Sequence, residues 1–236
     1  SWFKEFARSS IGMKQLMAVT GLGLAVFVLA HMVGNLQVFA GRDALNDYAA
    51  TLQGLGPLLW IMRGGILLIV LVHIFSGIRL VKLNKQARPV PYKVFKPVRS
   101  TWYSRYMAMT GIVLLAFIVF HLLHFTIGTV NAEGFQLWEM PAGEIVTAYA
   151  EGARHDVYGM VIAGFENPIV SGWYIVVMAL LAMHLSHGVT SFLQTLGLNH
   201  PKYNSLFKKA GPAYGLLIFV GNIAMPIAVL AGWVVK

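Results

Sequence analysis

Six of the eight histidines lie within long apolar stretches of the sequence, where an ionisable side chain is costly and usually marks function. These six are His31, His73, His121, His124, His184 and His187. An imidazole ring binds a transition metal through one nitrogen and can carry a proton on the other. The chain has no cysteine, which excludes thiolate nucleophiles, disulfides and Cys-ligated iron–sulfur clusters. The residue types therefore predict metal ligation or proton transfer by histidine.

The composition places these histidines in a membrane. Of the 236 residues, 57% are apolar and only 11% are charged, whereas about 25% are charged in an ordinary soluble domain. The mean hydropathy is +0.67. These values exclude a disordered chain, a coiled coil and a soluble enzyme. They favour one integral membrane domain over residues 1–236.

Five stretches are long enough to cross a bilayer as helices, which takes about 20 apolar residues each. They cover residues 14–39, 58–83, 103–128, 168–196 and 211–235. Each is continuously apolar rather than alternating, which favours helices over a β-barrel. The sequence thus predicts an all-α membrane protein with five transmembrane helices, the first four forming a bundle around the histidines.

The distribution of charge predicts the orientation. The net charge is +9, and 14 of the 18 Lys and Arg residues lie near the N-terminus or around the links after the second and fourth stretches. Those regions hold one acid, Glu5. By the positive-inside rule the N-terminus is cytoplasmic and the C-terminus is outside. The charge thus reflects topology, and no nucleic-acid partner is expected. The acidic link 128–168 lies outside as a lid or a ligand-gripping segment, with a short surface helix over Ala142–Ala153.

Four of the histidines fall into two pairs by depth. His31, His73, His121 and His184 each lie 15 residues after the start of the apolar run in their stretch, counted from Leu16, Leu58, Tyr106 and Ile169, which is about 22 Å along a helix. Successive helices run in opposite directions. His31 and His121 therefore lie toward the outer face, and His73 and His184 toward the inner face. The two levels are about 15 Å apart along the membrane normal.

Two imidazoles that face each other at one depth fit haem b, whose iron takes two axial ligands while its ring fills the space between helices. Gly34, Gly77 and Gly188 lie one turn after three of these histidines and would let a flat ring approach, although close helix packing alone would also explain them. A zinc site is disfavoured because the pairs are far apart and no carboxylate or thiolate accompanies them. The sequence therefore predicts two stacked haems b, each held by one pair.

The remaining two membrane histidines, His124 and His187, follow His121 and His184 by three residues and lie nearer the surfaces. We expect them to donate hydrogen bonds to haem propionates. A satisfied interfacial histidine is the alternative interpretation, and either residue could replace its neighbour as the ligand.

An internal repeat links the first and third stretches. Residues 17–31 and 107–121 share seven of 15 positions at a constant offset of 90, including Thr20-Gly21 with Thr110-Gly111 and His31 with His121. The repeat indicates that these two helices have equivalent roles.

Together these features resemble the single-chain, five-helix, dihaem cytochrome b membrane anchor of succinate dehydrogenase and fumarate reductase. The resemblance covers nearly the whole chain, and four ligands on the first four helices are its most specific part. It rests on Ser9-Ser10-Ile11-Gly12-Met13-Lys14, His31-Met32-Val33-Gly34-Asn35, Leu45-Asn46-Asp47-Tyr48, His73 with Gly77, His121-Leu122-Leu123-His124, and His184-Leu185-Ser186-His187-Gly188.

The resemblance implies that His31 and His121 bind the distal haem and that His73 and His184 bind the proximal haem. It implies an iron–sulfur subunit and a flavoprotein as partners, a place in the bacterial cytoplasmic membrane, and electron transfer to or from a quinone, usually menaquinone. A higher oligomer of the complex is possible in this family. The chain itself has no dicarboxylate site and no flavin motif, so it would be the non-catalytic subunit.

Candidate quinone residues form two groups, and an ordinary interfacial role is the alternative for every one of them. Asp43, Asp47 and Tyr48 lie near the outer level. Ser104, Arg105 and Lys14 lie near the inner surface. Some dihaem fumarate reductases carry a glutamate two positions before the fourth-helix ligand, thought to return protons across the membrane. Ala182 stands there in this chain, so a proton pathway of that kind is in doubt.

Two other functions stay open. A cytochrome b anchor of another quinone-linked dehydrogenase is one, although bc-type cytochromes place two more widely spaced ligands on one helix. A haem-free transporter or proton path lined by histidines is the other, although no Asp or Glu lies within the five stretches. Absorbance separates the cytochromes from the transporter.

Overall fold

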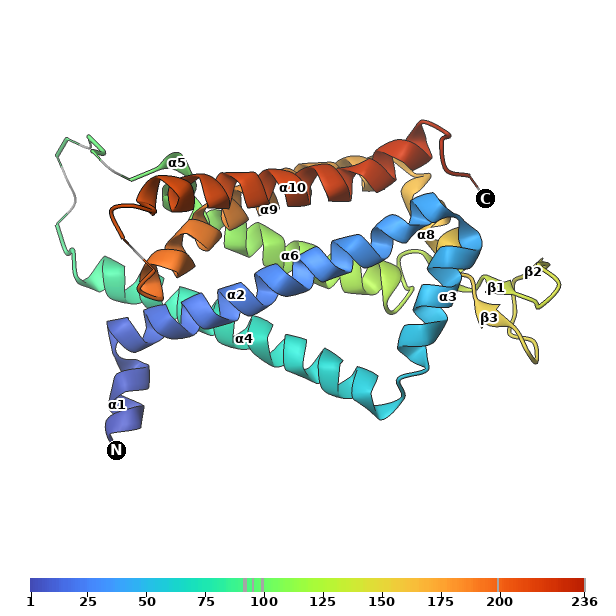
Figure 1. The fold of residues 1–236 in the computed structure, drawn as a ribbon, viewed down its shortest axis with the longest axis horizontal. Coiled ribbons are helices and arrows are strands. Elements are labelled where there is room, and N and C mark those ends of the chain that lie inside the picture. Colours follow the sequence, from blue (N-terminus) through green and yellow to red (C-terminus); the bar gives the residue numbers. More distant parts are fainter. Residues whose placement is uncertain (91–92, 95, 99, 199, 236) are drawn as a thin grey trace. The chain divides into compact units, whose positions relative to one another are not determined.

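Helices dominate the structure, a computed structural model that describes residues 1–90, 93, 94, 96–98, 100–198 and 200–235 (Figure 1). Within these residues five helices are long and apolar enough to cross a membrane, which confirms the predicted all-α membrane protein with five spans. They are α2 (Ser10–Asn35), which η1 (Leu36–Ala40) continues, α4 (Pro57–Gln86), α6 (Met107–Phe125), α9 (Pro168–Thr195) and α10 (Asn204–Leu230).

Two boundaries of the spans depend on a capping side chain or on a glycine. The third span is shorter than predicted because α5 (Trp102–Arg105) forms a separate turn before it. The Thr101 side chain caps α5 by accepting a hydrogen bond from the Ser104 amide at 3.2 Å. The first span tightens into η1 and stops at Gly41, whose φ of 102° suits glycine. Hydropathy alone does not predict the start of the third span, whereas the first span ends one residue after its predicted end at residue 39.

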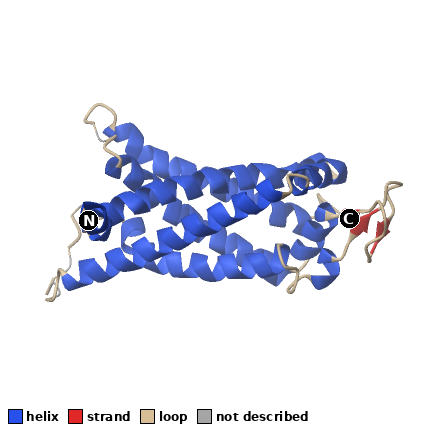
Figure 2. Cartoon of the chain, turned by 90° about the horizontal axis from the view of Figure 1, so that it is seen from below, coloured by secondary structure: helices blue, strands red, loops and turns tan. Residues whose placement is uncertain are grey.

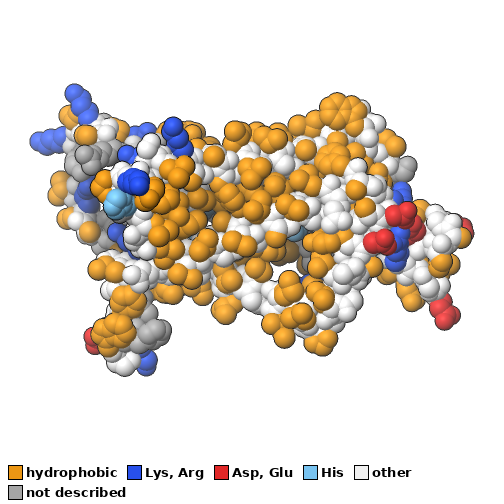
Figure 3. All heavy atoms as spheres, in the orientation of Figure 1, with side chains coloured by type: hydrophobic (Ala, Val, Ile, Leu, Met, Phe, Trp, Pro, Cys, Tyr) orange, Lys and Arg blue, Asp and Glu red, His pale blue; other side chains and the backbone are white. Residues whose placement is uncertain are grey.

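The long helices present apolar side chains to their surroundings, as a lipid-facing surface requires (Figure 3). Trp60, Ile61 and Leu68 of α4 and Ile112 of α6 are each 62–70% exposed. In water such a surface would drive aggregation, whereas in a bilayer it contacts lipid tails. The chain is therefore a multi-pass membrane protein.

The short elements precede the first span or connect successive spans, and Figure 2 draws the strands among them in red. The helices are α1 (Trp2–Arg8), α3 (Arg42–Gln53), α7 (Ala132–Phe135) and α8 (Val157–Phe165), and the strands are β1 (Trp138–Glu139), β2 (Ile145–Val146) and β3 (Arg154–His155). The strands form an antiparallel sheet in the order β2-β1-β3, with Trp138 opposite Val146 and His155. The predicted helix over Ala142–Ala153 is wrong, because Gly143 and Gly152 have φ angles of 84° and 82°, outside the helical region.

The chain divides into two compact units, and every long helix contributes to both. Unit 1 comprises Ser1–Val28, Arg63–Ile112 and Leu180–Leu217, and unit 2 comprises Leu29–Met62, Val113–Ala179 and Ile218–Lys236. That residues 1–236 form a single domain stays a prediction.

Backbone contact holds α9 and α10 together in unit 1. Gly211 and Gly215 of α10 lie so close to the carbonyl groups of Ser186 and Ala182 of α9 that no Cβ would fit. Small residues four apart let two membrane helices approach in this way. The Tyr214 hydroxyl also donates to the Ala25 carbonyl of α2 at 2.5 Å. The fifth span thus packs against two others in this unit.

A buried polar network positions α3 in unit 2. Asn46 is 1% exposed. Its amide donates to Glu139 at 2.7 Å and to Asp156 at 2.9 Å, while its oxygen accepts from the Tyr158 amide at 2.9 Å. Arg42 pairs with Asp156, which is fully buried and also caps α8. These bonds fix α3 against β1 and α8.

Arg154 extends this network to the surface. Its guanidinium donates to Glu139 at 2.8 Å and Asp43 at 2.9 Å, and it also pairs with Asp47. Figure 3 shows acidic and basic side chains gathered beside the place of the β1–β3 sheet in Figure 1. The hydrogen bond and charge of Arg154 lower the pKa of Glu139, and the hydrogen bond and charge of Glu139 raise the pKa of Arg154.

We expect Asn46→Ala to lower the free energy of unfolding by about 3 kcal/mol, because it removes one hydrogen bond from each of two buried carboxylates and leaves the buried Tyr158 amide without its partner. Thermal unfolding in detergent measures the loss, and hydrogen exchange should localise it to α3 and α8. Gln53→Ala, an exposed change on the same helix, is the control and should stay within about 0.5 kcal/mol. Equal effects of the two variants would contradict the network's role.

We expect the stabilisation by Glu139 to depend on pH. Its pKa is lower in the folded chain than the ordinary value of 4.5. Its ionised form therefore stabilises the fold at neutral pH, and this stabilisation is lost as the pH falls below 4.5 through the folded pKa. Glu139→Gln should thus be less stable than the parent at pH 7, and the difference should shrink toward pH 3. A constant difference across pH 3–7, measured by thermal unfolding, would contradict this.

Candidate functional site

His73 of α4 and His184 of α9 face each other in unit 1. Their ring centroids are 6.4 Å apart and the ring planes meet at 61°. Both side chains are half-buried. They form the inner of the two pairs that the sequence predicts.

A threonine from a neighbouring helix holds each of these rings. The Thr20 hydroxyl lies 3.1 Å from Nδ1 of His73, and the Thr110 hydroxyl lies 3.1 Å from Nδ1 of His184. Thr20 donates its one hydrogen to the Leu16 carbonyl at 2.6 Å, so its oxygen is left to accept from the imidazole. Thr110 likewise donates to backbone carbonyls of its own helix, at 3.1 Å.

This arrangement selects one tautomer of the neutral imidazole. A ring that donates from Nδ1 has its lone pair on Nε2, and Nε2 is then the atom available as a ligand. The glycine after each threonine lies beside the ring, and the space is tight at Gly21 only. A Cβ at Gly21 would lie 3.3 Å from Cε1 of His73, and a Cβ at Gly111 would lie 3.7 Å from Cε1 of His184. In each copy of the repeat, the threonine thus accepts a hydrogen bond from Nδ1 of one histidine.

His31 of α2 and His121 of α6 form the second pair, in unit 2. Their ring centroids are 5.8 Å apart and the rings are perpendicular. His31 is exposed and His121 is half-buried. This is the outer pair that the sequence predicts.

The hydroxyl of Tyr174 on α9 connects this pair to His124. It lies 3.2 Å from Nδ1 of His121 and 2.9 Å from Nδ1 of His124. With the hydroxyl hydrogen on the shorter bond, toward His124, the oxygen accepts from Nδ1 of His121. His121 then presents Nε2 as a ligand atom, as His73 and His184 do.

His124 and His187 have different surroundings. His124 is 2% exposed and packs against Phe125 and Phe165 beside Tyr174. Its burial and its bond to Tyr174 favour the interpretation of a satisfied histidine over that of a propionate donor. His187 is half-buried on α9, one turn after His184, and its propionate role stays a prediction.

The spacing of both pairs fits a metal between two imidazoles. A metal–imidazole bond is about 2 Å long, so two imidazoles on opposite sides of one ion have centroids about 6 Å apart. Among the residues that the structure describes, no group of three or more His, Cys, Asp or Glu is placed to hold an ion. A group such as haem, which brings four nitrogens of its own, needs only the two imidazoles.

The candidate quinone residues are in separate places. Asp43 and Asp47 are exposed and pair with Arg154. Tyr48 lies against Gly34, one turn after His31, so closely that its ring occupies the space of a Cβ.

The inner candidates lie at the surface of unit 1. Ser104 donates to the Thr101 carbonyl at 2.8 Å within the turn of α5. Arg105 and Lys14 are exposed. A quinone role for either group stays a prediction.

The glycines beside the histidines differ from the expected ones. Gly34 makes room for Tyr48, a Cβ at Gly77 would lie 3.1 Å from Cε of Met17, and a Cβ at Gly188 would meet no atom within 4 Å. The glycines that contact the predicted ligand rings are Gly21 and Gly111. The offset of 90 residues was the signal for both, because it repeats the Thr-Gly pair as well as the histidine. Nothing in the sequence singles out Tyr174.

Comparisons of the chain with models of protein families, with curated proteins and with solved structures found no match. The two histidine pairs and the side chains around them are therefore the main indication of function.

We expect Thr20→Val to change the tautomer of His73 alone and Thr110→Val that of His184 alone, because each removes one acceptor without changing the side-chain volume much. Each should cost about 1 kcal/mol of stability. Nitrogen-15 NMR of histidine-labelled protein, prepared without metal or cofactor, distinguishes protonated from unprotonated ring nitrogens. Each variant is the control for the other. Protonation at Nε2 of His73 in the parent protein would refute the arrangement.

Proposed function

We propose that the chain is a dihaem cytochrome b, with one haem b between His31 and His121 and a second between His73 and His184. The observation that carries this proposal is the facing of two imidazoles in each pair, with centroids 5.8 and 6.4 Å apart. The hydroxyl groups that accept from Nδ1 support it further, because they direct Nε2 toward a ligand role.

The chain's own residues have three tasks in this function. The four histidines hold the groups at fixed places in the bundle. Thr20, Thr110 and Tyr174 orient the rings and set the electron density on the ligating nitrogens. The apolar helices keep water away, which tunes the potential. When bound, haem b supplies a one-electron iron couple.

The wider role follows from the resemblance to the anchors of succinate dehydrogenase and fumarate reductase. We propose electron transfer between an iron–sulfur subunit, itself joined to a flavoprotein, and a quinone of the menaquinone type in the membrane. This chain would be the non-catalytic, quinone-binding subunit of that enzyme. Its exposed basic side chains in unit 1, such as Lys82 and Lys85, would attract an acidic partner.

We also propose an orientation of the chain and the membrane in which it lies. The basic segments favour a cytoplasmic N-terminus and an outer C-terminus. The resemblance favours the bacterial cytoplasmic membrane. The exposed salt bridges of Arg154 would then lie outside.

The pyridine haemochrome assay on the purified protein with its partners should give two haems b per chain. His31→Ala and His121→Ala should each lose the same haem and spare the other, whereas His73→Ala and His184→Ala should lose the second. The reason is that both imidazoles of a pair would be needed to hold its haem. His200→Ala, a change in an exposed link, should keep both.

Other outcomes are equally informative. A colourless protein with its lipids retained would overturn the cytochrome and favour a histidine-lined transporter. Loss of one spectral component from both His31→Ala and His73→Ala would overturn the pairing.

A further inference from the structure

A groove of about 770 Å³ lies between α1, α2 and α4 in unit 1. Its apolar wall includes Leu16 of α2 with Val72 and Phe75 of α4. Its polar lining comes from Lys4 and Arg8 of α1 and from Ser76 and Arg79 of α4. None of the six membrane histidines lines this groove, so it is separate from the pairs described above.

Two buried polar atoms of the groove have no partner. Ser76 is 0% exposed, and its Oγ makes no hydrogen bond with any described residue. The same holds for Nε of Arg79. An unpaired buried donor costs free energy comparable to a lost hydrogen bond, and such groups are usually satisfied by a bound molecule or water. The Nε of Arg79 can only donate, and the hydroxyl of Ser76 can donate as well as accept, so one acceptor group could satisfy both atoms.

The positive charge of the groove favours an anionic ligand. Lys4, Arg8 and Arg79 all line it, whereas Glu5 of α1 does not. The Arg79 guanidinium lies 3.5 Å from the Arg8 carbonyl oxygen through Nη2, which brings the two helices together. Guanidinium groups bind phosphate through several parallel hydrogen bonds.

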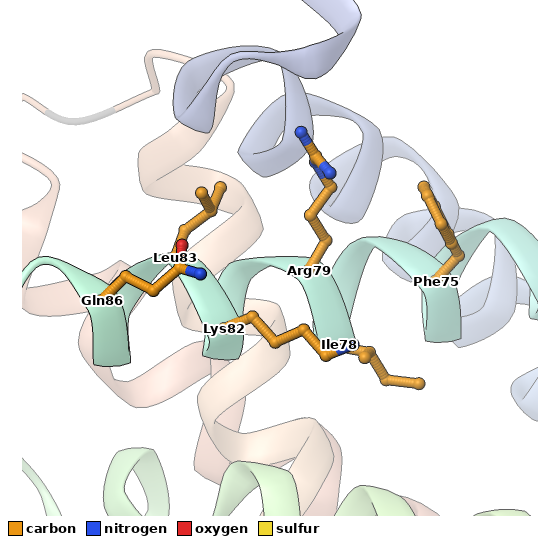
Figure 4. A pocket seen from close by; sticks show the side chains of 6 residues that line it. All are labelled: Phe75, Ile78, Arg79, Lys82, Leu83 and Gln86. Carbon is orange, nitrogen blue, oxygen red and sulfur yellow. The ribbon is translucent and has the colours of Figure 1, made fainter.

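The apolar wall specifies a ligand with a hydrocarbon part. Phe75 is 59% exposed and Leu16 is 38% exposed on spans that face lipid. A smaller hollow of about 190 Å³ continues along α4 and shares Phe75 and Arg79 with the groove. Figure 4 shows Arg79 and Phe75 pointing to the same side of α4, toward the blue N-terminal ribbon, with Lys82 directed away from it.

We propose that this groove binds an anionic phospholipid. Its phosphate lies between Arg8, Arg79 and Ser76, with Lys4 beside it, and an acyl chain lies along Leu16, Val72 and Phe75. A basic cluster next to an apolar span is the arrangement that attracts anionic headgroups. The site would tie α1 to α4 at the membrane surface, and it requires neither haem nor a partner subunit.

Native mass spectrometry of the whole chain in uncharged detergent, titrated with dioleoyl phosphatidylglycerol, tests the site. Each juxtamembrane charge contributes about fivefold to the binding of an anionic lipid. Arg8→Gln and Arg79→Gln should each weaken binding about fivefold, and the double variant about 25-fold. Arg79→Lys should recover part of the loss. Lys85→Gln, a change of equal charge on α4 outside the groove, should bind as the parent does.

Two further ligands identify what the groove recognises. Dioleoyl phosphatidylcholine, which has the same tails and phosphate but no net charge, should bind more weakly than phosphatidylglycerol. Inorganic phosphate should not displace phosphatidylglycerol at equal concentration, because it lacks the tails.

Three results would overturn the proposal. One is equal affinity of Arg79→Gln, Arg8→Gln and the parent for phosphatidylglycerol. Another is a loss as large in Lys85→Gln, which would indicate attraction by overall charge. The last is unchanged lipid binding together with loss of haem in Arg79→Gln, which would assign the arginine to a haem propionate instead.

Discussion

An imidazole inside a bilayer offers Nε2 to a ligand when its Nδ1–H group has a hydrogen-bond acceptor. Water is scarce there, so an oxygen atom of a neighbouring helix at the same depth serves as the acceptor. Thr20 and Thr110 do this for His73 and His184, and each hydroxyl is free to accept because its own hydrogen is used within its helix. The register of α2 against α4 and of α6 against α9 follows from this requirement. Gly21 follows as well, because a Cβ there would lie only 3.3 Å from Cε1 of His73.

The polar network of unit 2 has a different role, because it satisfies charged side chains that are buried next to apolar spans. Asn46 is central to it because one side-chain amide satisfies two carboxylates and a backbone amide together. The two arginines then balance the acids from the side of the solvent. Such a network is stable when it is complete and costly when one member is missing. This explains why α3 is held in place by side chains far apart in sequence.

The sequence predicted what depends on hydropathy and on counting residues along a helix. It predicted five spans and the two facing pairs of histidines, because depth in a membrane sets both. It did not predict the sheet of β1–β3, the buried helix α8 or the bridge by Tyr174, because these depend on contacts between distant segments. The predicted helix over Ala142–Ala153 is wrong because composition does not reveal the backbone angles of Gly143 and Gly152. The roles of the histidines as haem ligands, and of any residue toward a quinone, remain predictions.

The order of the helices has a consequence for biogenesis. The first hairpin, α2 with α4, contributes one histidine to each pair, and the second hairpin, α6 with α9, contributes the other. Neither hairpin holds a whole site. The long helix α9 brings both His184 and Tyr174, so both sites stay unfinished until the ribosome has delivered the fourth span to the membrane. A truncated chain that stops before α9 would therefore keep His31 and His121 without Tyr174, and it would lack the partner of His73 altogether.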